Sequence, residues 1–236
     1  MISKRVTLYG EYQRREIELL CSVVRPGDHV LDIGANIGIF SLYLSRAVGS
    51  GGRVIAVEPD PDNLALLRAN LEANQCRNVT VVPCALGAES GSAELFQVDR
   101  NRGNLSFADI AGTGKSVRVP VRRADEILGE LGVHQSTAAK VDVEGAEPAV
   151  FQGFGKSKPP IILFEFDPRL LCAQGHDPEA LLESLSAEGY SLDVIHPDTG
   201  ERIPAAPPRI HSLVTRINTT FNILAERRTQ PPPSVT

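Results

Sequence analysis

Acidic side chains stand at the ends of several apolar segments of this chain. Five of them close or follow such segments: Asp32, Glu58, Asp142, Glu144 and Glu165. A buried carboxylate costs free energy unless it is paired or solvated, so stability alone does not explain acids in these places. In open α/β sheets, ligands bind at the carboxyl ends of the strands. The pattern therefore indicates a polar pocket built from successive strand ends.

The turn after Asp32 gives the first indication of the ligand. It carries the pattern Gly34-x-x-x-Gly38, with Ala35 and Asn36 between the glycines. Dinucleotide-binding turns instead have the spacing G-x-G-x-x-G, which lets backbone amides approach a pyrophosphate, and Asn36 serves that approach poorly. An acid at the strand end suits an ammonium group, and the N–H groups that begin the next helix suit a carboxylate. The turn therefore favours S-adenosylmethionine, with Asp32 facing its amino group directly or through water.

A second strand end supplies a ribose ligand for the same pocket. Glu58 lies 26 positions after Asp32, near the spacing at which a doubly wound fold places its ribose-binding carboxylate, and Pro59 follows it. We therefore expect Glu58 to bind the ribose diol. By analogy with the same fold, the segment after the third strand contacts the adenine edge, through Cys84, Ala85 and Leu86.

The acids of the later strands suit methyl transfer to a hydroxyl group. This reaction is an in-line displacement, and a hydroxyl acceptor needs a base or a metal ion that acidifies it. If the strand at residues 138–143 stays extended to its end, Asp142 and Glu144 share one face. One of them is then the base, or both hold Mg²⁺ with another acid, and Glu165 is a further candidate base. In the alternative interpretation, these acids and Lys140 only position the following turn and cap the next helix.

Short strands and helices alternate along most of the chain and must position these acids. Strands are predicted at residues 29–33, 54–58, 79–83, 138–143, 161–166, 191–195 and 217–225, and helices near residues 11–24, 37–48, 61–74, 125–131 and 179–187. This alternation predicts an α/β fold with a parallel sheet covered on both faces. Residues 87–121 interrupt the alternation with short strands around a polar loop, 99–115. We expect that loop to be a lid over the acceptor or a solvated surface loop.

Several of these segments together resemble the FkbM-type methyltransferases, a family of the class I S-adenosylmethionine-dependent group. The segments are Tyr9-Gly10-Glu11-Tyr12 with Glu16, Asp32-Ile33-Gly34-Ala35-Asn36-Ile37-Gly38, Val57-Glu58-Pro59, Asp125-Glu126, Lys140-Val141-Asp142-Val143-Glu144-Gly145-Ala146-Glu147, and Glu165. The resemblance covers most of the chain and implies a Rossmann-like fold with a mostly parallel seven-stranded sheet, an antiparallel last strand and a small β insertion after strand three. It also implies that the donor binds at the second and third segments, and that a hydroxyl-bearing acceptor binds near residues 140–147.

Length and composition fit one domain and restrict its partners. The 236 residues lie within the range of a single α/β domain, expected at residues 1–228 with an N-terminal helical segment at 1–26 and a disordered tail at 229–236. The chain has 24 basic and 29 acidic residues, a net charge of −5 and no basic cluster, so nucleic acid is not an expected partner. Because no segment reads as a signal peptide or a membrane span, we expect a cytoplasmic protein without a membrane partner. A homodimer is one candidate for its oligomeric state.

The sequence thus predicts an S-adenosylmethionine-dependent O-methyltransferase that acts on a small hydroxylated metabolite, natural product or sugar. Two alternatives from other classes stay open. An NAD-type oxidoreductase predicts hydride transfer and nicotinamide binding, but the Gly34-x-x-x-Gly38 spacing disfavours it. A catalytically silent binding module predicts that the cofactor binds without turnover of any acceptor.

Overall fold

One eight-stranded sheet forms the centre of the described part of the chain. The structure is a computed structural model, and it describes residues 13–97, 105–109, 112, 114, 116–196, 198–207, 210 and 220–227. The strands are β1 (His29–Ile33), β2 (Arg53–Val57), β3 (Val79–Val82), β8 (Ala138–Val141), β9 (Ile161–Phe166), β10 (Tyr190–Ile195), β11 (Arg202–Pro204) and β12 (Phe221–Arg227), in the order β11-β10-β12-β9-β8-β1-β2-β3. Neighbouring strands in the series β9-β8-β1-β2-β3 are parallel. Strand β12 runs antiparallel to both of its neighbours, β9 and β10.

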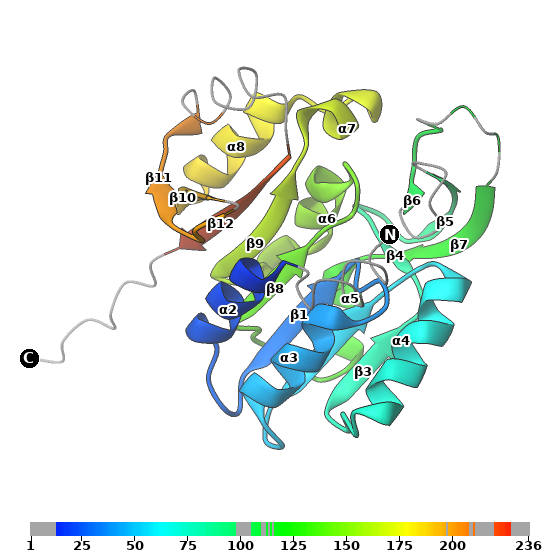
Figure 1. The fold of residues 1–236 in the computed structure, drawn as a ribbon. Coiled ribbons are helices and arrows are strands. Elements are labelled where there is room, and N and C mark those ends of the chain that lie inside the picture. Colours follow the sequence, from blue (N-terminus) through cyan, green and yellow to red (C-terminus); the bar gives the residue numbers. More distant parts are fainter. Residues whose placement is uncertain are drawn as a thin grey trace, which may run out of the picture.

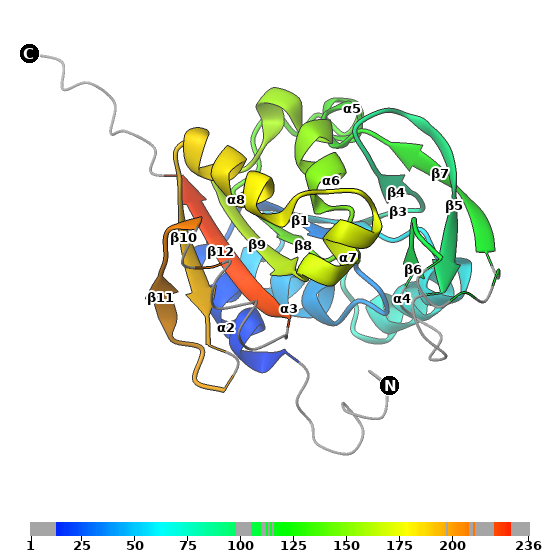
Figure 2. The same cartoon turned by 90° about the horizontal axis from the view of Figure 1, so that it is seen from above.

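Helices cover both faces of this sheet, as the alternation of elements predicts. They are α2 (Arg14–Val23), α3 (Ile39–Val48), α4 (Pro61–Ala73), α5 (Ala124–Glu130), α6 (Glu147–Gly153), α7 (Pro168–Ala173) and α8 (Pro178–Ala187), and a 3₁₀ turn at Gly155–Ser157 follows α6. Figures 1 and 2 show α2, α3 and α4 on one face and α5, α6 and α8 on the other. The start of α4 is set locally, because the Asp60 side chain accepts hydrogen bonds from the N–H groups of Asp62 and Asn63 and Pro61 occupies the first turn.

The insertion after β3 forms a second sheet of four strands. They are β4 (Ala85–Leu86), β5 (Gly91–Gln97), β6 (Leu105–Ser106) and β7 (Ser116–Arg122), in the order β4-β7-β5-β6. The small sheet stands to the right of the main sheet in both Figures 1 and 2. Its presence confirms the β insertion expected after the third strand. Of the loop expected to be a lid, residues 105–109, 112 and 114 are described, and the rest lies outside the described residues.

The two central strands place charged residues in a largely apolar core. All four residues of β8 and four of the five residues of β1 are buried. Strands of a parallel sheet that is covered on both faces are apolar along their whole length, which makes such strands recognisable in the sequence. Asp32 on β1 is 0% exposed and Lys140 on β8 is 6% exposed. Both charges therefore need partners inside the protein.

Within the described residues the sheet has eight strands, one more than the seven predicted. The additional strand, β11, pairs antiparallel with β10 at the edge of the sheet. Pro204 ends this strand, and proline is tolerated at an edge because one side of an edge strand needs no N–H donors. The guanidinium of Arg202 holds β11 in place through the carboxylates of Asp193 on β10 and Glu226 on β12.

The fourth predicted strand also ends earlier than expected, at Val141 instead of residue 143. Glu144 has a left-handed backbone with φ 55°, and Gly145 has φ 99°. A chain with these angles cannot continue as an extended strand. Asp142 and Glu144 therefore do not share a face by strand alternation, and their proximity must have another cause.

Three further expectations lie wholly or partly outside the described residues. They concern the segment Tyr9-Gly10-Glu11-Tyr12, the tail at 229–236 and the beginning of the strand predicted at 217–225, which is described from Phe221 onwards as β12. The single domain at 1–228 stays an expectation. Within the ranges that the structure describes, no helix is both long enough and apolar enough to cross a membrane.

Candidate functional site

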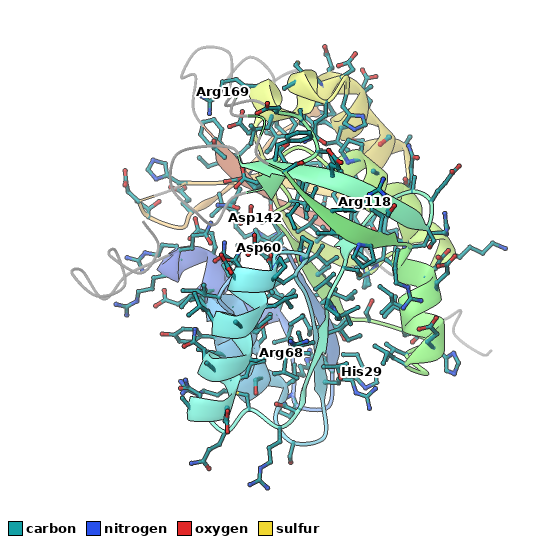
Figure 3. The ribbon with its side chains drawn as sticks, turned by 90° about the vertical axis from the view of Figure 1, so that its right-hand side faces the viewer. His29, Asp60, Arg68, Arg118, Asp142 and Arg169 are labelled. Atoms are coloured by element: carbon teal, nitrogen blue, oxygen red, sulfur yellow. The ribbon has the colours of Figure 1, made fainter. Side chains whose placement is uncertain are left out.

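One cavity opens where β1, β2, β8 and β9 end, the place that the sequence predicts for a pocket. Its volume is ≈ 960 Å³ with the open solvent at its mouth included. It is lined by most of the predicted cofactor residues, Gly34, Ala35, Asn36, Glu58, Pro59, Cys84, Ala85 and Leu86, and by all three predicted catalytic residues, Asp142, Glu144 and Glu165. In Figure 3, Asp142 lies between α4, which follows Asp60, and the small sheet, which carries Arg118. The structure thus brings both predicted groups into one site.

Backbone donors hold Glu58 on the cofactor side of this cavity. The N–H of Asn36 donates to Oε2 at 2.7 Å, the N–H of Asp60 donates to Oε1 at 2.9 Å, and the Asn63 amide approaches Oε1 at 3.4 Å. Burial raises the pKa of Glu58, and these donors oppose the rise. Because a carboxylate oxygen has two lone pairs, Oε2 retains one for a hydroxyl donor. This geometry fits a ribose diol at Glu58.

The two glycines of the turn are required by the packing of the protein itself. A Cβ atom on Gly34, whose φ is 72°, would lie 1.9 Å from the backbone oxygen of Asp142. A Cβ atom on Gly38, whose φ is 91°, would lie 2.5 Å from Cδ1 of Leu67 on α4. Left-handed angles of this kind favour glycine at both positions. Gly38, predicted as a cofactor residue, lies outside the cavity lining and instead lets α3 begin close against α4.

Asp32 lies behind the cavity wall. Its carboxylate is fully buried, does not line the cavity, and accepts a hydrogen bond of 2.6 Å from Oγ of Ser41 on α3. Burial raises the pKa of Asp32, while the Lys140 ammonium and the Ser41 hydroxyl oppose the rise. A direct contact with a cofactor amino group is closed to Asp32, because its side chain is buried and points toward α3, and the contact through water stays a prediction. Alternation along β1 gives two possible directions for this side chain, and the spacing of the turn does not choose between them.

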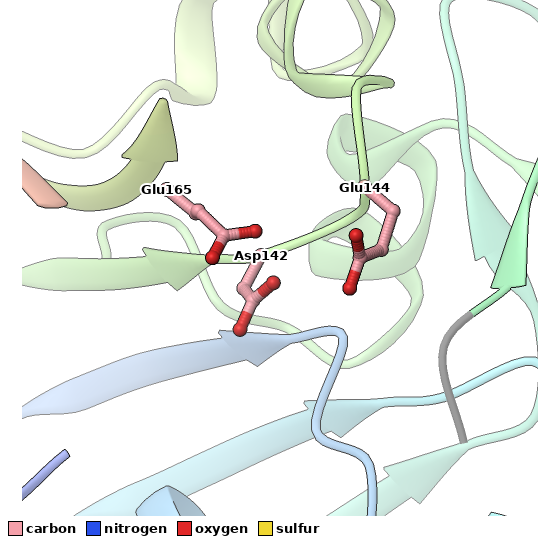
Figure 4. Close-up of side chains that lie close together, drawn as sticks. All are labelled: Asp142, Glu144 and Glu165. Atoms are coloured by element: carbon pink, nitrogen blue, oxygen red, sulfur yellow. The ribbon is translucent and has the colours of Figure 1, made fainter. Parts of the chain in front are cut away.

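The three candidate catalytic acids come together in one cluster. One carboxylate oxygen each from Asp142, Glu144 and Glu165 lies within 4.8 Å of the others. Figure 4 shows Asp142 beyond the end of β8, Glu165 on β9 and Glu144 on the loop that follows β8, with their carboxyl groups directed into the same space. The convergence is thus produced by two neighbouring strand ends and by the left-handed backbone of Glu144. Three carboxylates at this spacing can accept a proton from a hydroxyl or ligate a hard divalent cation.

The loop that presents Glu144 is fixed from two sides. The backbone oxygen of Glu144 accepts hydrogen bonds from the Gln174 amide at 2.6 Å and the Ser106 hydroxyl at 3.1 Å. Oε1 of Glu147 accepts from the N–H groups of Val143 at 3.3 Å and Gly145 at 3.4 Å. These contacts hold Glu144 in a backbone conformation that a non-glycine residue rarely adopts. These contacts of Ser106 and Gln174 could not be predicted from the sequence, because the two residues lie 38 and 30 positions from Glu144.

The surroundings of Glu144, Glu147 and Glu165 favour the protonated form of these three carboxyl groups. Burial, followed by the nearby charges of Asp142 and Glu147, raises the pKa of Glu144 to about 8. Burial also raises the pKa of Glu147 to about 7, against the opposing effect of its backbone donors. The pKa of Glu165 is raised well above its ordinary value, first by burial and then by the charges of Asp142 and Glu144. The cluster therefore has capacity to exchange protons or to take up a cation near neutral pH.

Lys140 balances part of this negative charge. Its Nζ donates a hydrogen bond of 2.8 Å to the backbone oxygen of Gly34 and lies 3.3 Å from Asp142 and 3.9 Å from Asp32. Burial lowers the pKa of Lys140, but the attraction of the two aspartates outweighs it, so the pKa ends above its ordinary value. Lys140 and Asp142 thus form an ion pair. Lys140 also joins the glycine turn to the acidic cluster, which the sequence did not indicate.

Several residues that sequence reasoning missed also line the cavity. They are Gln13, Ile33, Ile37, Ile39, Phe40, Val57, Leu95, Phe107 and Val143. Most are apolar residues whose nature is equally suited to the core. Leu95 and Phe107 come from the insertion, and Gln13 precedes α2. No local pattern distinguishes these residues, because they reach the site only through the packing of separate elements.

Comparisons with known proteins identify the family. The model of the FkbM methyltransferase domain matches residues 32–192, more than half of the chain. The chain is 29% identical to the 31-O-demethyl-FK506 methyltransferase FkbM of Streptomyces tacrolimicus, over 87% of this chain and 85% of that protein. It is 27% identical to Methyltransferase 1 of Beauveria bassiana, over 80% of this chain and 81% of that protein.

Solved structures support the fold. The FkbM methyltransferase of Methylobacillus flagellatus superposes with a TM-score of 0.51 at 18% identity, over 89% of this chain and 50% of that one. Precorrin-6y C5,15-methyltransferase of Geobacter metallireducens gives a TM-score of 0.53 at 16% identity, over 94% and 91%. At these identities the likeness shows the Rossmann-like class I methyltransferase fold alone. Together with the match of the domain model, these findings leave the oxidoreductase alternative without support, and the chain belongs to the FkbM family of S-adenosylmethionine-dependent methyltransferases.

Proposed function

We propose that this methyltransferase transfers its methyl group to a hydroxyl oxygen of a small metabolite, natural product or sugar. The observation that carries the proposal is the cluster of Asp142, Glu144 and Glu165 in the same cavity as Glu58. A sulfonium donor is already activated and needs no acid from the protein. Carboxylates beside the acceptor would instead remove the proton of the acceptor hydroxyl. The name of the relative from Streptomyces tacrolimicus, which specifies an O-demethyl substrate, agrees with an oxygen acceptor.

The cofactor side of the cavity fits S-adenosylmethionine. Glu58 would accept hydrogen bonds from the ribose hydroxyls, and Pro59 closes the wall beside it. The segment Cys84 to Leu86 would contact the adenine edge, and burial raises the pKa of the Cys84 thiol to about 11, so that this wall stays neutral. When bound, the cofactor supplies an electrophilic methyl carbon. The chain must therefore hold the acceptor oxygen in line with that carbon, and positioning of this kind supplies about 7–11 kcal/mol of such a barrier.

We assign the acceptor proton to the acidic cluster, with Asp142 as the first candidate base. Asp142 lies 3.3 Å from the Lys140 ammonium and forms an ion pair with it. Glu144 and Glu165 are the other candidates, and their raised pKa values let them hold a proton near neutral pH. With these groups, a proton can leave the acceptor oxygen without entering bulk water.

A divalent cation such as Mg²⁺ is a further part of the proposal. Asp142, Glu144 and Glu165 offer oxygen ligands, the type that Mg²⁺ prefers. Such an ion would lower the pKa of an acceptor hydroxyl and would displace the protons held by Glu144 and Glu165. We also propose that the protein works in the cytoplasm on small molecules, without a nucleic acid or membrane partner.

The test is methylation with a ¹³C-methyl donor across a panel of hydroxylated small molecules, with Mg²⁺ and with a chelator. The carbon chemical shift of the product distinguishes a methoxy group from a methyl group on nitrogen or carbon. A methoxy product supports the proposal, and its loss in the chelator supports the metal. A product methylated only on nitrogen or carbon would overturn the O-methyltransferase assignment. Cofactor binding without any turnover across the panel would favour the silent binding module.

A further inference from the structure

The amino group of a bound S-adenosylmethionine needs a partner that Asp32 does not provide. An ammonium carries three N–H donors and requires acceptors on the cavity wall. Asp32 is buried behind that wall and does not line the cavity. The backbone oxygen of Gly34 accepts from Lys140 and keeps one lone pair, so it can take at most one of the three donors. The other N–H groups need further acceptors on the cavity wall.

Gln13 offers an acceptor of this kind. Its side chain lines the cavity, and its Oε1 is buried without a hydrogen-bond partner in the described part of the structure. A buried polar atom left unpaired costs about 1–3 kcal/mol, and a hydrogen bond from a ligand to Oε1 would remove this cost. As a neutral group, the amide can accept from an ammonium without adding to the charge of the acidic cluster.

The backbone of Gln13 also indicates a functional placement. Gln13 is the N-cap residue of α2, and its backbone angles are φ 45° and ψ 39°. Residues other than glycine seldom adopt this left-handed conformation. Its side chain makes no capping hydrogen bond to the helix. Strain of this type is kept where the surrounding structure, or a bound ligand, favours it. The side chain is thereby available to the cavity and not to the helix.

The packing of α2 against α3 places Gln13 beside the expected amino acid head. Ile17 and Leu20 of α2 share one core cluster with Phe40 and Leu44 of α3, and the two helices lie next to each other in Figures 1 and 2. Phe40, in the first turn of α3, lines the same cavity as Gln13. The first turn of α3 is the place whose N–H groups suit the carboxylate of the same head. We infer that Oε1 of Gln13 accepts a hydrogen bond from the α-amino group of S-adenosylmethionine.

The inference is tested by calorimetric binding of two ligands that differ only in that amino group. These are S-adenosylhomocysteine and its deamino analogue, in which hydrogen replaces the amino group. Gln13→Met removes the acceptor and keeps the length of the side chain. We expect this variant to raise the Kd of S-adenosylhomocysteine about tenfold and to leave the Kd of the deamino analogue unchanged. Gln13→Glu keeps an acceptor, so its Kd for S-adenosylhomocysteine should stay within a few-fold of that of the wild type.

Glu58→Gln is the matched control, because a ribose contact is common to both ligands and its loss should raise both Kd values. Equal weakening of both ligands by Gln13→Met, or no weakening of either, would overturn the inference. Failure of the wild-type chain to bind S-adenosylhomocysteine would overturn it together with the cofactor assignment. The inference rests on that cofactor and not on the acceptor, so its failure would leave the proposed O-methylation standing.

Discussion

The ammonium of Lys140 donates a hydrogen bond of 2.8 Å to the backbone oxygen of Gly34, 106 positions away in the chain. The same ammonium is paired with Asp142 at 3.3 Å. One buried cation thus connects the glycine turn of the cofactor side with the acidic cluster of the acceptor side. The ring of Phe40, with its centroid 5.3 Å from Nζ, covers this connection.

Replacement of Lys140 by methionine should therefore affect stability and cofactor binding together. Loss of one partner of a buried ion pair costs about 3–5 kcal/mol, because the other charge stays buried without compensation. We expect Lys140→Met to lower the free energy of unfolding in urea by an amount of this order and to weaken binding of S-adenosylhomocysteine.

A double variant provides the control for this prediction. Asp32→Asn removes the fully buried charge that Lys140 balances from behind the turn. The loss of unfolding free energy in the double variant Lys140→Met with Asp32→Asn should therefore be smaller than the sum of the losses in the two single variants. Strict additivity of the two changes in unfolding free energy would contradict an electrostatic role for Lys140.

Asp142→Asn should separate chemistry from cofactor binding. The amide keeps the shape of the side chain but cannot take the acceptor proton. We expect methyl transfer to fall by about 10²-fold or more, with the Kd of S-adenosylmethionine within a few-fold of the wild-type value. Single-turnover kinetics with an acceptor found in the panel would measure this. Unchanged turnover would remove Asp142 from the catalytic role.

The elements of this site that could be predicted are those governed by local rules. Apolar runs that end in an acid located β1, β2, β8 and β9, and the strand-end rule for α/β sheets then joined Glu58 to Asp142 and Glu165. The glycine turn was also recognisable, although packing against Asp142 and Leu67 is what requires its glycines.

The remaining features depend on contacts between distant segments. The direction of Asp32 is decided by Ser41 on α3, and the edge strand β11 by partners of Arg202 on two other strands. The place of Gln13 depends on how α2 packs against α3. A single sequence without such contacts contains no signal for any of them.

The loop of Glu144 offers a prediction about positioning. Gln174→Leu removes the 2.6 Å hydrogen bond to the backbone oxygen of Glu144 and leaves that oxygen with the Ser106 hydroxyl as its donor. The loss of one hydrogen bond costs about 0.5–1.5 kcal/mol. We expect a lower kcat with little change in the Kd of S-adenosylmethionine, because the cofactor wall is not touched. Gln152→Leu, the same substitution at an exposed glutamine of α6, is the control and should change neither quantity. Equal losses in both variants would argue against a specific role for Gln174.

The buried acids also predict how stability depends on pH in the metal-free protein. The pKa values of Glu144 and Glu147 are raised to about 8 and about 7 in the folded chain, from an ordinary value of 4.5. Between these limits the folded state holds protons that the unfolded state has released, so the free energy of unfolding falls as the pH rises. Their contribution is complete below about pH 4.5 and is lost by about pH 8.

Urea unfolding between pH 5 and pH 8 in the presence of a chelator measures this slope. Glu144→Gln and Glu147→Gln should each make it shallower, because neither amide titrates. Glu183→Gln, which changes an exposed acid of α8, should leave the slope as it is in the wild type. A wild-type slope that all three variants share would contradict the assignment of these protons to the cluster.

The most direct test of a single cavity with a cofactor side and an acceptor side is calorimetric titration of S-adenosylmethionine into three proteins. They are the wild type, Glu58→Ala and Asp142→Asn, each also titrated with NAD. We predict that the wild type and Asp142→Asn bind S-adenosylmethionine with similar Kd values, that Glu58→Ala binds it at least tenfold more weakly, and that none of them binds NAD. Equal binding by Glu58→Ala and the wild type, or binding of NAD in place of S-adenosylmethionine, would contradict the account.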